Sequence, residues 1–348
     1  MTDEKTDIAR RKSDHIDIVL EQEVGFARLT TGFEAYRFVH CALPEISLEE
    51  VDLTASLFGR PLKAPFLISS MTGGPAHAET INAHLAEAAE ELGLALAVGS
   101  QRIALEEQGS GGMTKELRKK APSIALIGNL GAAQILGPEG LDRARRSIDM
   151  IEADGLFIHL NPLQEAIQPG GDRDWRGVLQ AIATLCDEGL PIAVKEVGFG
   201  LSAQLVRQLM DVGVQTIDVA GAGGTNWARV EGHRGKAAYA LAEAFTEWGI
   251  PTAKAVIEAR AAAPGVRLIA SGGIKGGIDA AKALRLGADI VGQAAATLGP
   301  AIDGPEAVIH HFRELTEVLS IACFVTGSVN IDALKKAPME GLSDLNRP

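Results

Sequence analysis

The sequence is poor in aromatic residues, which make up 4% of its 348 residues, whereas glycine accounts for 39 of them. A core with few aromatic rings must be built from Ala, Val, Leu and Ile. Buried parallel strands are aliphatic in this way, and their turns need glycine. With 46% hydrophobic and 22% charged residues, the chain has enough apolar surface to offset its conformational entropy, which excludes disorder. The composition therefore favours a parallel α/β fold.

Cysteine is scarce as well, and the three that occur are far apart: Cys41, Cys186 and Cys323. Their odd number and the absence of a CxxC pair argue against a disulfide framework or a zinc site. Residues 1–17 lack the apolar stretch of a secretory signal, and glycines and amides interrupt the longest uncharged run, 121–138. We expect a cytoplasmic protein with no membrane partner.

An excess of positive charge is also missing, because 33 Lys and Arg stand against 45 Asp and Glu, a net charge of −12. A field of this sign repels polyanions. We therefore expect no nucleic-acid partner.

Short aliphatic runs that end in glycine-rich or polar turns alternate with stretches of helical periodicity, which is typical of βα units. Helical patterns such as Ala76 to Leu92 and Leu201 to Val212 are followed by Gly93 and Gly213 as C-terminal stops. Eight such units predict an α/β fold of the (β/α)8 TIM-barrel class. The predicted strands are residues 65–70, 94–98, 124–127, 156–160, 192–195, 216–219, 267–270 and 289–292.

The predicted strands divide the chain into three parts. Residues 1–64 form an N-terminal extension that we expect to contribute to the substrate site, residues 65–325 form the barrel, and residues 326–348 form a C-terminal tail. The connection from Thr225 to Val266 is longer than the others. Since long βα connections lie over the active face of a barrel, it is a candidate lid.

Two turns after the last predicted strands suit a phosphate. SGGIKGG (271–277) opens a helix, where free backbone N–H groups and the helix dipole favour an anion. GQAAA (292–296) offers small side chains that let a ligand approach the backbone. Ordinary turn glycines remain the alternative interpretation.

Other strand ends bring small residues, hydrogen-bonding groups and one cation to the same mouth, which suits a flavin. In this interpretation an amide contacts the pyrimidine edge and a lysine stabilises negative charge near N1. An ion-paired strand-end lysine is an equally consistent reading of Lys195 taken alone. The segments are MTGG (71–74), GSQR (99–102), GNLG (128–131), Lys195 and GGT (223–225).

Two polar segments suit a diphosphate and its metal. In HLNPLQE (159–165), Glu165 is a candidate Mg²⁺ ligand, because Mg²⁺ often takes one carboxylate plus waters and substrate phosphates. Gln164 does not titrate, but it can orient a reacting group; simple helix capping is the alternative. ARRKSDHI (9–16) would bind a diphosphate if it folds over the mouth, with Arg102 adding a bidentate contact, and would otherwise be a solvated tail.

These motifs occur in the order found in a known family. RKSDHI, PEISLEEVD, MTGG, GSQR, GNLGA, HLNPLQE, KEVGFG, DVAGAGGTNW and SGGIKGGIDAAKALRLGAD together span nearly the whole chain. The sequence resembles the type 2, FMN-dependent isopentenyl-diphosphate delta-isomerases. Three positions differ from the usual family pattern: Asn226 stands for Ser, Lys275 for Arg, and the GQAAA turn, with Ala295, for one containing Arg and Pro.

The resemblance implies sites for FMN, substrate and metal. The FMN positions are Ser70, Met71, Thr72, Ser100, Asn129, Lys195 and Thr225, with the flavin phosphate at Gly272, Gly273, Ala294 and Ala295. The substrate positions are Arg11, Lys12, His15, Ser100, Gln101, Arg102, His159, Asn161 and Gln164. Glu165 corresponds to the Mg²⁺ ligand. By the same resemblance we expect reduced FMN as the active form, NADPH as the reductant, and a homotetramer or larger homo-oligomer.

The implied reaction is a 1,3-proton shift between isopentenyl and dimethylallyl diphosphate without net redox change. Protonating an unactivated alkene needs a strong acid, which reduced FMN is expected to supply while Gln164 orients the transfer and Lys195 supports the flavin. A 2-hydroxy acid oxidase is disfavoured because AGAGGTNW (220–227) lacks the His base and Arg clamp. An inosine-monophosphate dehydrogenase-like enzyme is disfavoured because Cys186 falls at a helix end. A non-catalytic flavin sensor would need neither the diphosphate clamp nor the metal ligand.

Overall fold

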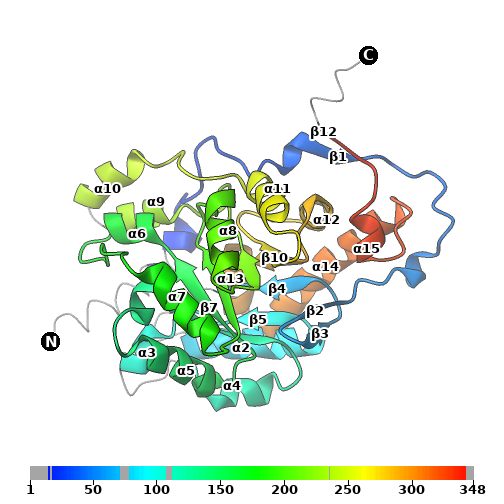
Figure 1. Ribbon diagram of the computed structural model, residues 1–348. Coiled ribbons are helices and arrows are strands. Elements are labelled where there is room, and N and C mark those ends of the chain that lie inside the picture. Colours follow the sequence, from blue (N-terminus) through cyan, green and yellow to red (C-terminus); the bar gives the residue numbers. More distant parts are fainter. Residues whose placement is uncertain (1–14, 16–17, 71–77, 107–111, 235, 342–348) are drawn as a thin grey trace.

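Eight parallel strands close into a barrel in the computed structural model, which describes residues 15, 18–70, 78–106, 112–234 and 236–341 (Figure 1). Each strand pairs with the next along the chain, and the last pairs with the first. The TIM-barrel prediction is confirmed. The strands are β4 (Phe66–Ile68), β5 (Ala95–Ala97), β6 (Leu126–Gly131), β7 (Gly155–Leu160), β8 (Ile192–Glu196), β9 (Thr216–Asp218), β10 (Arg267–Ala270) and β11 (Ile290–Gln293).

One predicted boundary is wrong. GNLG was expected to be a turn after a strand at 124–127, but it lies within β6, where Ile127 to Gly131 pair with Gly155 to His159 of β7. Ladder pairing holds this stretch extended despite its two glycines. Asn129 is therefore a strand residue, with its side chain on the same face as Ile127, which belongs to the barrel interior.

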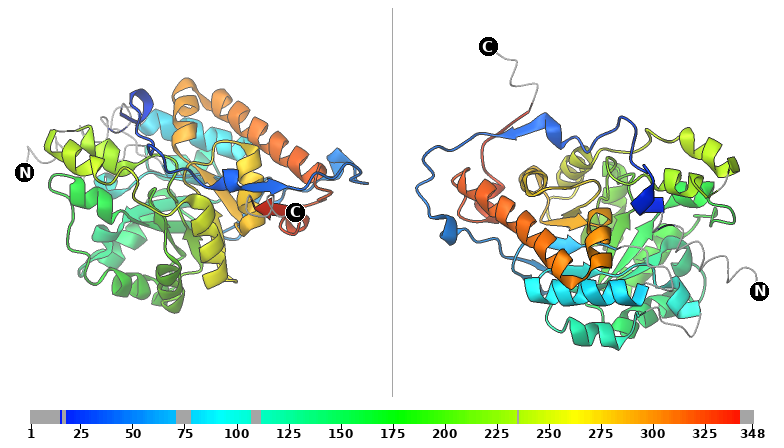
Figure 2. Two further views of the ribbon diagram at one scale, coloured as in Figure 1. Left: turned by 90° about the horizontal axis from the view of Figure 1, so that it is seen from above. Right: turned by 180° about the vertical axis from the view of Figure 1, so that it is seen from behind.

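Helices surround the barrel and pack their apolar faces on the outward residues of the strands. The long α14 runs beside α2, as Figure 2 shows from behind. Gly93 and Gly213 follow α2 and α8 with φ of +64° and +94°, as expected for C-terminal stops. The barrel helices are α2 (Ala78–Leu92), α4 (Lys115–Lys120), α5 (Gly140–Ile151), α7 (Val178–Asp187), α8 (Ala203–Asp211), α11 (Thr252–Ala262), α12 (Gly277–Leu286) and α14 (Pro305–Phe324).

Several short elements are additions to the βα units. The long connection after β9 contains α9 (Trp227–Gly232) and α10 (Lys236–Glu243), which pack against α6 (Pro162–Ile167). The others are α3 (Arg102–Glu106), α13 (Ala295–Asp303), α15 (Ile331–Leu334) and the 3-10 turns Phe33–Ala35, Leu48–Glu50 and Ala132–Ile135.

A hairpin closes the floor of the barrel, by which we mean the amino ends of its strands. It consists of β2 (Ala55–Leu57) and β3 (Arg60–Leu62). Phe58 and Gly59 at its tip both have positive φ, as a two-residue type I′ turn requires. Leu57 and Leu62 join the interior residues of the barrel in one buried cluster. The floor is thus sealed by apolar packing.

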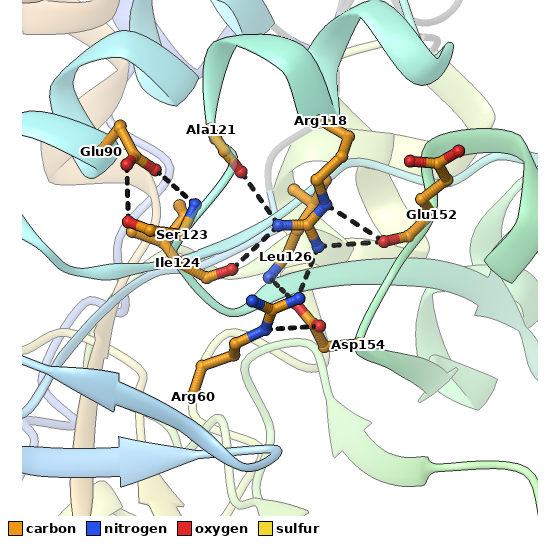
Figure 3. Close-up of polar contacts among 9 residues, drawn as sticks. All are labelled: Arg60, Glu90, Arg118, Ala121, Ser123, Ile124, Leu126, Glu152 and Asp154. Carbon is orange, nitrogen blue, oxygen red and sulfur yellow. Dashed lines mark hydrogen bonds and ion pairs between the residues drawn. The ribbon is translucent and has the colours of Figure 1, made fainter.

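A buried ion pair between Arg118 and Asp154 fastens this floor (Figure 3). Arg118 Nη2 donates to Asp154 Oδ2 over 2.7 Å, and Leu126 N donates to the same oxygen over 3.0 Å. Arg60 of the hairpin donates to Asp154 Oδ1 over 2.8 Å. The remaining Arg118 donors reach the carbonyl oxygens of Ala121, Ile124 and Glu152. We call Arg118, Asp154 and these partners the first floor clasp.

The same construction recurs four strands further round the barrel, around Arg260 and Asp289. Arg260 Nη2 donates to Asp289 Oδ2 over 2.7 Å, which also accepts Leu268 N over 2.9 Å. Lys335 of the C-terminal segment takes the place of Arg60 at Oδ1. Arg260 also donates to the carbonyl oxygens of Ala263, Val266 and Gly287, at the same chain offsets from Arg260 and Asp289 as in the first clasp. This second floor clasp indicates that the two halves of the barrel repeat.

The two ends of the described chain meet outside the barrel. β1 (Tyr36–Phe38) and β12 (Met339–Gly341) pair as an antiparallel two-stranded sheet, and they lie side by side in Figure 1. The C-terminal segment therefore anchors the N-terminal one.

Candidate active site

The mouth, meaning the carboxyl ends of the barrel strands, is lined by polar side chains that point inward. Successive residues of a strand face opposite sides, and most of these positions lie two residues after a buried interior residue such as Ala193 or Ile269. They lie in the last residues of their strands or just beyond the strand end. The inward polar residues include Ser69, Asn129, His159, Lys195, Asp218 and Ser271.

Two glycine turns interlock at this mouth. Gly272 and Gly273 have φ of +100° and +72°, and Gly223 has φ of +117°. A Cβ on Gly272 would lie 2.1 Å from the carbonyl oxygen of Gly221, and one on Gly224 would lie 2.5 Å from Gly273 N. Only glycine allows this approach. The two turns therefore pack backbone against backbone, and Gly223, Gly272 and Gly273 are half-buried.

Lys195 and its neighbours form a buried charged group. Lys195 is 6% exposed, and its Nζ donates to the carbonyl oxygen of Glu196 over 2.6 Å. Burial lowers the pKa of Lys195, while the charges of Asp218 and Glu196 oppose that shift. Glu196 Oε2 accepts the backbone N–H groups of Val197 and Gly198 over 2.6 and 2.7 Å, and that of the residue after them. Burial nevertheless raises the pKa of Glu196 to about 7.

An amide and an imidazole link three neighbouring strands. Asn129 Oδ1 lies 2.8 Å from His159 Nδ1, and Asn129 Nδ2 donates to the carbonyl oxygen of Val98 over 3.2 Å. The amide of Gln101 is fully buried: its Nε2 donates to the carbonyl oxygen of Ser147, and its Oε1 accepts Asn129 N over 2.9 Å. Gln101 thus fixes Asn129 and does not expose its side chain at the mouth.

The HLNPLQE segment runs from the end of β7 into α6, where Asn161 is the N-cap residue but its side chain makes no capping bond to the helix backbone. Asn161 Nδ2 donates to Gln164 Oε1 over 3.2 Å and to Glu165 Oε1 over 2.9 Å. Glu165 Oε2 accepts Asp172 N over 2.8 Å. Arg102 lies 3.3 Å from the Asp172 carboxylate. The predicted phosphate and metal ligands, Arg102 and Glu165, therefore meet through Asp172.

Glu231 of α9 is a site residue that the sequence did not reveal. Its carboxylate is wholly buried; Oε1 lies 3.0 Å from His15 Nε2 and accepts Gln164 Nε2 over 2.9 Å, while Oε2 pairs with Arg234 over 3.1 Å. Burial alone would raise its pKa. The hydrogen bond and charge of His15, together with Gln164 and Arg234, outweigh burial and lower the pKa of Glu231 to about 2. Glu231 is therefore a permanent anion that holds His15 and Gln164.

The remaining predicted residues have the following places. Ser100 Oγ accepts Arg102 N over 3.5 Å, and Thr225 bridges to Gly25 of the N-terminal segment. Ala294 caps α13, which begins at Ala295. Asn226 is fully buried and its side-chain amide donates to the carbonyl oxygens of Phe245 and Thr246, and Lys275 is exposed. Arg11, Lys12, Met71 and Thr72 lie outside the described residues.

These residues fit FMN. Ser70 Oγ is buried and has no hydrogen-bond partner in the part of the chain that the structure describes, so a hydroxyl is left for a ligand. The glycine turns offer backbone donors, and Lys195 is the buried cation. The fit to a metal is narrower: within the described ranges there is no cluster of three His, Cys, Asp or Glu that would hold one. Glu165 would need a diphosphate and waters to complete the coordination of Mg²⁺.

A cavity of about 710 Å³ lies between α6, α7 and α8 and meets the site described above at Glu196. Apolar side chains such as Leu163 and Leu205 line most of it, and the charged residues of its described lining are Glu196 and Glu247. Since this described lining includes no Lys, Arg or His, the cavity does not suit a diphosphate.

None of the helices in the described part of the chain has the length and apolar character that a bilayer crossing demands.

The closed barrel and its glycine-lined mouth define a flavin-barrel class. The profile of a family described as FMN-dependent dehydrogenase matches residues 5–113 and 162–340. A flavocytochrome b2 structure superposes with a TM-score of 0.71 at 15% identity, over 95% of this chain and 84% of the other. A mandelate oxidase superposes with a TM-score of 0.66 at 16% identity, over 93% and 95%. Likeness at this identity shows the fold.

Closer relatives narrow the class. An isopentenyl-diphosphate delta-isomerase of Xanthobacter autotrophicus is 62% identical, over 95% of this chain and 97% of its own. The proteins of that name from Stutzerimonas stutzeri and Pseudescherichia vulneris are 57% and 53% identical, over 97% and 99% of this chain and 99% of theirs. The chain belongs to the isopentenyl-diphosphate delta-isomerases within the FMN-dependent dehydrogenase family.

Proposed function

We propose that this protein interconverts isopentenyl diphosphate and dimethylallyl diphosphate, a step of isoprenoid biosynthesis, by a 1,3-proton shift with reduced FMN. The observation that carries the proposal is the cluster around Glu231. It joins His15 of the N-terminal extension to Gln164 of the HLNPLQE segment at the barrel mouth. A simple flavin-binding barrel has no need of this junction.

Gln164 acts as the orienting group. Its Nε2 donates to Glu231 and its Oε1 accepts from Asn161, so both ends of the amide are fixed. A glutamine does not titrate, and Glu231, with a pKa of about 2, has no proton to give near neutral pH. When bound, reduced FMN would supply the proton-transfer chemistry. The residues of the chain therefore hold and align the alkene.

The diphosphate would be held by cations and by a metal. Arg11, Lys12 and Arg102 supply positive charge, and Glu165 is the proposed Mg²⁺ ligand, with diphosphate oxygens and waters as the other ligands. The proximity of Asp172 to both Arg102 and Glu165 supports this arrangement.

Further features of the enzyme are proposed on chemical grounds. NADPH, a hydride donor, is the proposed reductant of FMN.

A homotetramer or larger assembly is supported by exposed apolar side chains on one segment, with Leu241 56% and Trp248 61% exposed. A cytoplasmic location is supported by three free cysteines. The net charge of −12 disfavours a nucleic-acid partner.

Anaerobic turnover tests the proposal. The purified protein is incubated with isopentenyl diphosphate, FMN and Mg²⁺, with and without dithionite or NADPH. We expect dimethylallyl diphosphate only when a reductant is present, and loss of product when the metal is chelated. Bound FMN without any conversion would contradict the proposal.

Gln164→Ala tests the role of its amide. We expect at least about a hundredfold loss of turnover, within the range of a lost orienting contact, with little change in FMN affinity. Gln215→Ala is the matched control, because Gln215 is exposed at the opposite end of the barrel, just before β9. Equal turnover of the two variants would remove Gln164 from the mechanism.

A further inference from the structure

Asp218, the last residue of β9, is a fully buried carboxyl with one oxygen left over. Oδ1 accepts Ser271 Oγ over 2.7 Å and Ala220 N over 3.2 Å. Oδ2 is also buried and has no hydrogen-bond partner among the described residues. A buried carboxylate oxygen without a donor is costly, so this oxygen calls for a compensating charge.

Lys195 is the cation on the neighbouring strand. The β8–β9 register places Lys195 beside Asp218, and strand alternation turns both side chains into the barrel. The charges of two acidic residues raise the pKa of Lys195, and these residues are Asp218 and Glu196. The Glu196 carboxylate is already engaged by three backbone N–H groups, which leaves Asp218 as the uncommitted counter-charge.

Asp218 also connects the two glycine turns. Its bond to Ala220 N reaches the turn after β9, where Ala220 has a φ of +37°, an unfavourable value for a residue with a Cβ. Its bond to Ser271 reaches the residue just before Gly272 and Gly273. One carboxyl thus contacts both turns and lies beside the lysine.

We propose that Asp218 is a positioning residue for the flavin site, which keeps Lys195 protonated inside the barrel and holds the two glycine turns in register. The inference rests on the proposed role of Lys195 toward FMN. Burial raises the pKa of Asp218, opposed by Lys195, and lowers the pKa of Lys195, opposed by Asp218, so each group maintains the charge of the other. Without Asp218, the lysine would lose its proton at a lower pH.

Asp218→Asn separates charge from geometry. The Oδ1 atom of an asparagine can accept the same two hydrogen bonds, so the substitution removes the charge and puts an NH2 group in place of Oδ2 while both turn contacts are kept. We expect FMN affinity, measured by quenching of flavin fluorescence, to weaken for Asp218→Asn at a lower pH than for the wild type, because Lys195 loses its proton earlier. At the highest pH at which the wild type still binds FMN with full affinity, the variant should bind at least tenfold more weakly. Ser271→Ala, which keeps the charge, should follow the pH dependence of the wild type.

Thermal unfolding of the FMN-free protein gives a second, independent readout. Lys195→Met and Asp218→Asn should each lower the unfolding temperature, because each leaves one buried charge uncompensated. The double variant should unfold at a higher temperature than either single variant. This comparison of the two single variants with the double variant, a double-mutant cycle, remains informative if Asp218→Asn alone is too unstable for the FMN titration.

The outcomes are distinct. A uniform loss of FMN affinity without pH dependence, or additive losses in the cycle, would reduce Asp218 to a turn contact and overturn the proposal. Failure of the wild-type protein to bind FMN would contradict the proposed function instead, while the cycle in FMN-free protein would still decide the pairing of Lys195 with Asp218.

Discussion

The two ends of the barrel differ in how completely their buried charged groups are hydrogen-bonded. At the floor, each clasp surrounds an arginine and an aspartate with partners, and both carboxylate oxygens of the aspartate accept hydrogen bonds. At the mouth, one oxygen of Asp218 has no hydrogen-bond partner among the described residues, and burial raises the pKa of Glu196 to about 7. The floor is built for stability, whereas the mouth carries destabilising charge that a ligand can use.

The largest effect is expected from breaking a floor clasp. Arg118→Met leaves Asp154 and several carbonyl groups underpaired, and should cost about 4 kcal/mol of unfolding free energy, measured by urea denaturation. Activity per folded molecule should not change. Arg313→Met is the control: its ion pair with Glu91 is exposed and should contribute less than about 1 kcal/mol. Similar losses in both variants would contradict the importance of the clasp.

A pH titration should show the contrasting behaviour of the mouth. Folded Glu196 holds its proton to about pH 7, whereas the unfolded chain releases it near 4.5, so stability should fall as pH rises from 4.5 to 7. The pKa difference corresponds to at most about 3 kcal/mol. Glu196→Gln should remove this part of the slope in unfolding experiments. Glu188→Gln, at an exposed carboxylate, should leave it in place.

The glycine turn allows a comparison within a few residues. Gly272→Ala adds a Cβ at a φ of +100° and against the Gly221 backbone, and should weaken FMN binding by about tenfold or more. Gly276→Ala lies in the same turn, where an added Cβ meets nothing within 4 Å, and should bind FMN normally. Fluorescence titration of both variants checks this. Unimpaired binding by Gly272→Ala would exclude the turn from the FMN site.

The smallest effect is expected at Asn226, where the family usually has serine. Asn226→Ser keeps an oxygen that can cap α9 but loses the bonds to Phe245 and Thr246, which should cost about 1 kcal/mol. FMN affinity should stay the same because the lost bonds are to Phe245 and Thr246, which are not among the predicted FMN positions. A marked drop in FMN affinity would show that this departure affects the cofactor.

The barrel was predictable because each of its strands and helices can be recognised from residues that are close together in the sequence. Each strand is an aliphatic run of a few residues, and the glycine that follows a helix identifies its end, as Gly93 and Gly213 do. The error at GNLG has the opposite origin. Glycines and an asparagine are typical of a turn, and only pairing with β7, a tertiary contact, makes the segment a strand.

The site was predictable only in part, for the same reason. Lys195 and the HLNPLQE segment stand out because polar residues directly follow aliphatic strands. Asp218 carries the same signal, an acid at the end of such a strand, and could have been found by it. Glu231 could not, because its partners His15 and Gln164 lie in two distant segments that meet it only in the fold.

The pairing of β1 with β12 has a consequence for the order in which the protein matures. The first described strand takes its partner from the last, so it has none until residues 339–341 have been synthesised. The barrel can close earlier, since its strands pair with sequence neighbours and need only β11 to finish the ring. On the ribosome, the N-terminal segment that brings His15 to Glu231 would therefore be secured after the barrel, and the enzyme would acquire its activity last.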